Sequence, residues 1–137
     1  MRNLNNYYIK IAKQTAKLSR AKKLQVGCLI VKDGCIISQS WNGTPSGFDN
    51  ECEYILEHGA LMTKEIVVHA EMNALAKVAK STNSSDGATL YCTHSPCFEC
   101  SKAIIQSGIK EVYYAETYRD EKPISFLKQA GIKVEKI

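Results

Sequence analysis

The chain has 137 residues, of which 45% are apolar and 23% are charged. These fractions are typical of an ordinary globular protein, and they argue against the disordered, fibrous and membrane-spanning classes. The formal net charge is +4, with one Trp and three Phe. Nucleic-acid-binding proteins usually carry a more basic stripe with aromatic platforms, so we expect neither a nucleic acid nor a membrane as partner. We expect one domain over residues 1–137.

The cysteines are expected to be reduced thiols. The first twenty residues carry five basic side chains and no continuous apolar run, so we expect no export signal and a cytoplasmic location. Only Cys97 and Cys100 have the spacing of metal ligands. Cys28, Cys35 and Cys92 lie in apolar, strand-like stretches, where we expect them to be core residues.

Hydrophobic periodicity and turn residues predict alternating helices and strands in the second half of the chain. Periods of three and four residues indicate helices, and short β-rich runs bounded by Gly, Asn and Asp indicate strands. The predicted helices are 6–19, 52–62, 68–80, 95–108 and 123–130, and the predicted strands are 26–31, 35–40, 88–93, 111–115 and 132–137.

The order of these elements predicts an α/β fold. Asp33-Gly34 is a tight-turn signal, so strands 26–31 and 35–40 should form an antiparallel hairpin. Helices between the later strands favour parallel neighbours, which predicts a mixed five-stranded sheet in a three-layer α/β/α sandwich. Residues 41–50 are rich in turn formers and should form a loop. Loops of this length often carry function, although a plain connector is the alternative.

Two short motifs predict a metal site with a proton-transferring group. Cys97 and Cys100 lie in the first turn of a predicted helix, where the helix dipole favours the metal-binding thiolate. His69 at the start of another helix can supply a third ligand, leaving the fourth zinc position to water. Glu71 would then reach that water. The alternatives are a redox Cys-x-x-Cys pair, or a closed structural zinc site with His94 as fourth ligand.

The segments His69-Ala70-Glu71 and 96–100 together resemble the signature of the zinc-dependent cytidine/deoxycytidylate deaminase family. The resemblance implies one catalytic Zn²⁺ per subunit, held by His69, Cys97 and Cys100. It also implies that Glu71 takes a proton from water and delivers protons to N3 of the pyrimidine and to the departing ammonia. Ala70 would line the substrate site.

The resemblance extends to the deoxycytidylate (dCMP) deaminases through the segments 26–31, 41–45, 67–75 and 106–114. It implies hydrolysis of dCMP to dUMP and ammonia, a reaction that feeds thymidylate synthesis. The substrate-binding residues implied in this way are Asn42 on the sugar hydroxyl, Gly43 and Thr44 near the phosphate, Tyr118 on the pocket wall, and Lys23, which stands where relatives often carry Arg. A solvated Lys23 is the alternative.

Members of this family are typically homo-oligomers, often hexamers, that are activated by dCTP and inhibited by dTTP. The resemblance therefore implies these two effectors, with Mg²⁺ accompanying dCTP. Only residues 51–68 separate the loop from the zinc histidine, where relatives often carry a long insertion. The alternatives are a free cytidine or deoxycytidine deaminase, a tRNA adenosine deaminase, and a non-catalytic zinc module that binds nucleotides.

Overall fold

A computed structural model describes residues 3–137 of the chain. Its helices are α1 (Asn5–Ala16), α2 (Ala70–Ala79), α3 (Phe98–Gln106) and α4 (Lys122–Gln129), with a 3-10 turn η1 (Glu57–Gly59). Its strands are β1 (Gly27–Lys32), β2 (Cys35–Trp41), β3 (Glu53–Ile55), β4 (Leu61–Thr63), β5 (Thr89–His94), β6 (Glu111–Glu116) and β7 (Lys133–Lys136). No helix in this part of the chain combines the length and the apolar character that crossing a membrane requires.

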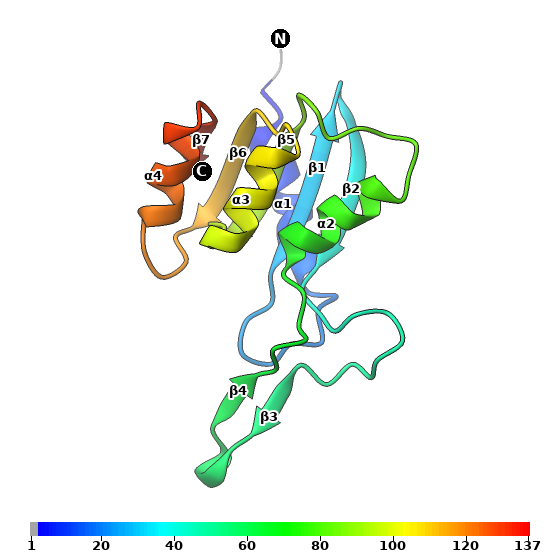
Figure 1. Cartoon of the computed structure of the whole chain (residues 1–137), viewed down its shortest axis with the longest axis vertical. Coiled ribbons are helices and arrows are strands. Elements are labelled where there is room, and N and C mark those ends of the chain that lie inside the picture. Colours follow the sequence, from blue (N-terminus) through cyan, green and yellow to red (C-terminus); the bar gives the residue numbers. More distant parts are fainter. Residues whose placement is uncertain (1–2) are drawn as a thin grey trace.

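The main sheet has five strands in the order β2-β1-β5-β6-β7. Strand β1 is antiparallel to both β2 and β5, whereas β5, β6 and β7 are parallel to one another. Helix α1 covers one face of the sheet, and α2, α3 and α4 cover the other (Figure 1). The predicted three-layer sandwich with a mixed five-stranded sheet is confirmed.

The core is divided between the two faces of the sheet. Successive strand residues point to opposite faces, so the neighbours Leu29 and Ile30 of β1 enter different clusters. The cluster under α1 includes Tyr8, Ile9, Ala12, Leu29, Tyr91 and Tyr113. The larger cluster under α2, α3 and α4 includes Ile30, Ala74, Leu90, Ile104, Val112 and Leu127. The central strands β1, β5 and β6 are therefore buried on both faces, which fixes the strand ends that form the site.

The helix predicted over residues 52–62 is wrong. Strands β3 and β4 pair there as an antiparallel hairpin that projects away from the main sheet (Figure 1). His58 and Gly59 have φ values of +64° and +80° in the connection, which a continuous α-helix does not allow. Ile55, at 73% exposure, packs against no core. The apolar residues of this segment do not form a helical stripe because no part of the sheet lies beneath them.

Two further sequence predictions are corrected by the structure. Helix α3 begins at Phe98 with Cys97 as its N-cap, so Ser95, where the predicted helix begins, lies outside it. The Ser95 hydroxyl instead accepts a hydrogen bond from the backbone N–H of Tyr118. Cys35 is exposed rather than buried, because it follows the turn at the edge of the sheet.

Gly27 allows the close approach of α1 to β1. A Cβ atom at this position would collide with the carbonyl oxygen of Ala12 and would lie 2.6 Å from the backbone nitrogen of Ala16. We expect Gly27→Ala to lower the free energy of unfolding by about 1–3 kcal/mol, measured by urea denaturation, because backbone atoms cannot rotate away. Gly43→Ala is the matched control, since a Cβ there meets nothing within 4 Å. Equal losses in both variants would contradict this explanation.

Candidate active site

The candidate site lies where two helices begin. His69 is the N-cap of α2 and Cys97 is the N-cap of α3, both with extended backbone, so each side chain stands at a helix N-terminus. Glu71 is the second residue of α2. Residues two apart inside a helix point in opposite directions, but His69 lies outside the helical turn. This local geometry lets His69 and Glu71 line the same cavity.

The side chains of His69, Cys97 and Cys100 come together as a compact group of donor atoms. Each sulfur lies 3.4 Å from Nδ1 of His69, and all three donor atoms lie within 4.8 Å of one another. Zinc–sulfur and zinc–nitrogen bonds in a tetrahedral site imply a sulfur-to-nitrogen separation of about 3.5 Å. One Nδ1 atom cannot donate a single proton to two sulfurs with full strength. The donor set therefore fits one zinc ion.

Contacts within this group shift the pKa values of its two thiols and of the imidazole. Hydrogen bonds from the Cys100 side chain and then from His69 lower the pKa of Cys97 to about 3. The same contact, followed by burial, raises the pKa of Cys100. The hydrogen bond to Cys97 also raises the pKa of His69. A thiolate is the form of cysteine that binds a metal ion, and the lowered pKa of Cys97 favours that form.

Glu71 is a buried carboxyl group beside these ligands. Its exposed fraction is 4%. Burial raises the pKa of Glu71, while its own backbone N–H and the charge of His69 act in the opposite direction. A carboxyl group with a raised pKa in a cavity is suited to accepting and returning a proton near neutral pH.

A cavity opens directly above Glu71 and the three ligand side chains. Its empty volume is about 620 Å³ when the open mouth is included. The other lining residues come from the α1–β1 connection, the Asn42 loop, the β3-β4 hairpin, the approach to α2 and the ends of β5 and β6: Ala21, Leu24, Val26, Asn42, Glu53, Thr63, Val67, Ala70, His94, Ser95 and Tyr118.

The structure brings together most, but not all, of the residues predicted to bind substrate. Asn42, Ala70 and Tyr118 line the cavity. Gly43 and Thr44 instead line a second hollow together with Arg20, Ser40, Trp41, Asn42, Pro45, Ser46, Asn50, Cys52, Asn73 and Lys77. The Lys23 side chain is exposed and lies outside the residues that line either hollow.

The Asn42 side chain fastens the loop to the strand that precedes it. Its Oδ1 accepts a hydrogen bond from the backbone N–H of Val26 at 2.9 Å, and its Nδ2 donates to the carbonyl oxygen of Leu24 at 2.8 Å. An amide oxygen can accept two hydrogen bonds and an amide nitrogen can donate two. Asn42 therefore retains one acceptor and one donor position beyond those used to fix the loop.

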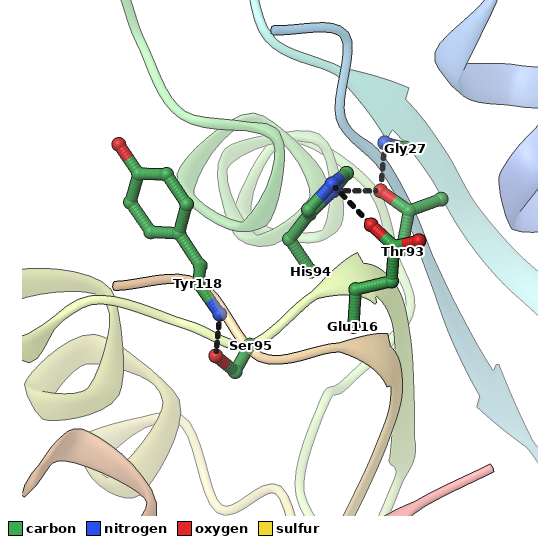
Figure 2. Close-up of polar contacts among 6 residues, drawn as sticks. All are labelled: Gly27, Thr93, His94, Ser95, Glu116 and Tyr118. Atoms are coloured by element: carbon green, nitrogen blue, oxygen red, sulfur yellow. Dashed lines mark hydrogen bonds and ion pairs between the residues drawn. The ribbon is translucent and has the colours of Figure 1, made fainter. Parts of the chain in front are cut away.

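Sequence reasoning missed the contribution of His94 to the cavity wall. The Gly27 N–H donates to Thr93 Oγ1 at 3.1 Å, Thr93 Oγ1 lies 2.9 Å from His94 Nδ1, and His94 Nε2 lies 3.4 Å from the Glu116 carboxylate (Figure 2). Burial lowers the pKa of His94, and Glu116 opposes that shift. His94 is not part of the ligand group, so the alternative of a closed zinc site built on it is unsupported.

The fold and the site together define a zinc-dependent deaminase, because that class combines His/Cys/Cys ligation with a nearby glutamate that does not bind the metal. Residues 2–116 match the family described as "Cytidine and deoxycytidylate deaminase zinc-binding region", and the chain belongs to this family.

Individual relatives agree with this assignment. ComE operon protein 2 of Bacillus subtilis is 39% identical over 97% of this chain and 70% of its own length. The deoxycytidylate deaminase of Enterobacteria phage T4 is 36% identical over 92% of this chain and 86% of its own length. The dCMP deaminase of cyanophage S-TIM5, solved in complex with dCMP and dUMP, is 48% identical with a TM-score of 0.92, covering 100% of this chain and 99% of that chain.

Proposed function

We propose that this chain hydrolyses dCMP to dUMP and ammonia. The observation that carries the proposal is that His69, Cys97 and Cys100 come together beside the buried carboxyl group of Glu71 at an open cavity. The choice of dCMP as substrate is supported by the likeness to the cyanophage enzyme, whose structure holds dCMP and dUMP. The product dUMP would feed thymidylate synthesis. Since nucleotides are charged metabolites of the cell interior, we expect the enzyme to work in the cytoplasm.

Each side chain of the site has a distinct part in this proposal. His69, Cys97 and Cys100 hold the zinc ion, which when bound acts as a Lewis acid and lowers the pKa of water at the site. Glu71 accepts the proton that the attacking water loses. It then delivers protons to N3 of the cytosine ring and to the amino group that leaves as ammonia. Burial favours the protonated carboxyl group, so the returned proton comes from a competent acid.

The walls of the cavity supply contacts to the nucleotide. Asn42 uses its remaining acceptor and donor positions on the sugar hydroxyl, while Ala70 and Tyr118 border the base. Gly43 exchanges two backbone hydrogen bonds with Val68, at 2.8 and 3.1 Å, directly before the zinc histidine. Thr44 donates its hydroxyl to the carbonyl oxygen of Asp49 within the loop. Gly43 and Thr44 thereby fix the loop, and they approach the nucleotide from its outer side.

Regulation by dCTP and dTTP in a homo-oligomer, a hexamer by resemblance, is the second part of the proposal. The hollow on the outer side of the Asn42 loop supports it, because Arg20 and Lys77 lie there among Asn, Ser and Thr side chains. Two cations with polar neighbours suit a nucleotide triphosphate, with Mg²⁺ neutralising the remaining phosphate charge. The loop that borders this hollow also contributes Asn42 to the substrate cavity, which provides a direct route for the effect.

A substrate panel tests the function. We expect kcat/KM for dCMP to exceed that for deoxycytidine by at least about tenfold, since a charge-assisted contact to phosphate contributes about 1.5–3 kcal/mol. The panel includes CMP, cytidine and a tRNA adenosine substrate, each with and without dCTP and Mg²⁺. Preference for deoxycytidine or for the tRNA would refute the substrate assignment. Zinc-loaded protein without turnover on any of them would support a non-catalytic module instead.

A further inference from the structure

The cavity contains no permanently charged cation to receive a phosphate group, since its two histidines are the zinc ligand His69 and His94, which pairs with Glu116. Its lining includes neither Lys nor Arg, and it does include the carboxyl groups of Glu53 and Glu71. A phosphate monoester carries about −1.5 to −2 charges near neutral pH. If the substrate is a nucleotide, as the proposed function holds, its phosphate must meet a cation at the rim of the cavity. This inference therefore rests on the proposed function.

The rim formed by Lys22 and Lys23 is poorly suited to this task. The backbone N–H groups of both lysines donate to the same carboxylate oxygen of Glu53, at 2.8 and 3.1 Å. That carboxylate lines the cavity and would repel a phosphate on this side. Lys64, on the hairpin side, is directed over the ring of Tyr54 at 5.4 Å.

Arg119 is an exposed arginine that directly follows the lining residue Tyr118 in the chain. Its guanidinium group lies over the ring of Tyr118, 4.8 Å from the centroid, and Tyr118 itself lines the cavity. Within residues 3–137, no carboxylate lies within 4.0 Å of Arg119. A planar guanidinium matches phosphate oxygens with two parallel hydrogen bonds.

The backbone around Arg119 is held in place by the segment that carries the zinc ligands. The hydroxyl of Ser95, which is 3% exposed, accepts the Tyr118 N–H at 2.7 Å (Figure 2). The Ser95 N–H in turn donates to the Glu116 carbonyl oxygen at 2.9 Å. Arg119 itself has φ +64°, a left-handed conformation uncommon for residues other than glycine. Such conformations cluster at ligand-binding sites. The position of Arg119 is thus tied to Ser95, two residues before Cys97.

We propose that Arg119 binds the 5′-phosphate of the substrate and makes the enzyme prefer a nucleotide to a nucleoside. Tyr118 orients the guanidinium by stacking against it, and the Ser95 contact fixes the distance of both from the reacting base. Arg119 takes no part in proton transfer. Its contribution is therefore to binding, and it depends entirely on the presence of the phosphate.

The test compares the substrates dCMP and deoxycytidine in a set of single-residue variants. Arg119→Ala is expected to lower kcat/KM for dCMP by about 10- to 100-fold, mainly through KM, and to leave kcat/KM for deoxycytidine within about threefold. Arg119→Lys should recover part of the loss, because it keeps the charge without the planar fork. Lys122→Ala is the matched control, because Lys122 is an exposed side chain at the start of α4, lies outside the cavity lining, and loses the same charge.

The inhibition constants of dUMP and deoxyuridine can be compared in the same variants. These two molecules also differ by the phosphate group, and neither of them is turned over. Equal losses on dCMP and deoxycytidine would overturn the role of Arg119, as would an equal effect of Lys122→Ala. A selective loss in Lys23→Ala, with none in Arg119→Ala, would also overturn it. A different result would refute the proposed function itself, namely a preference of the unmodified enzyme for deoxycytidine over dCMP. A dCMP preference that survives in Arg119→Ala removes only the role of Arg119.

Discussion

Replacing Glu71 with Gln is expected to reduce kcat for dCMP deamination by about 10²- to 10⁴-fold, which is the usual contribution of a positioned acid–base group. Gln has the same shape and hydrogen-bonding reach, but it cannot take a proton from water and return it to the base. Glu71 is not part of the His69, Cys97 and Cys100 group. Zinc content should therefore remain unchanged.

The measurement combines steady-state kinetics with metal analysis of the same preparation. Glu99→Gln is the matched control, because Glu99 lies between the two zinc cysteines, is exposed and pairs with Lys102 at 2.7 Å. It should retain nearly full kcat. If Glu71→Gln turned over dCMP at an unreduced rate, Glu71 could not be the proton-transferring group.

Replacing Cys100 with Ser should abolish both zinc binding and deamination. Cys100 is 1% exposed, and its sulfur lies 3.4 Å from His69 Nδ1, so no other side chain can take its position without moving α3. A hydroxyl is a much poorer zinc ligand than a thiolate. Because metal binding contributes to the free energy of folding, we also expect a lower Tm.

Cys35→Ser is the matched control for this change. Cys35 is exposed at the start of β2, and its loss should alter neither zinc content nor Tm. Zinc per chain is measured by atomic emission and Tm by calorimetry, with and without a chelator. A Cys100→Ser protein that kept its zinc and its activity would show that the ligand set is wrong.

The zinc ligands could be predicted from the sequence because the information is local. Cys97 and Cys100 are separated by two residues, and His69 and Glu71 by one, so short motifs beside predicted helix starts reveal them. The hairpin turn at Asp33-Gly34 is local for the same reason, and β1 and β2 pair as expected. The five-stranded sheet followed from the alternation of buried strands and amphipathic helices.

The remaining walls of the site depend on contacts between distant segments. Ser95 and Tyr118 are 23 residues apart, and no property of either residue alone predicts their hydrogen bond. Glu53 and Thr63 reach the cavity through the β3-β4 hairpin, which sequence analysis took for a helix. The apolar residues of that hairpin are exposed, so they carry none of the periodicity that burial imposes.

Conversion of dCMP by the purified, unmodified protein is the most direct test of the central claim. The account predicts that protein carrying one zinc ion per chain forms dUMP and ammonia in equal amounts. It also predicts that a chelator stops the reaction and that added zinc restores it. Failure of the zinc-loaded protein to form dUMP, or turnover that continues undiminished after the zinc is removed, would contradict it.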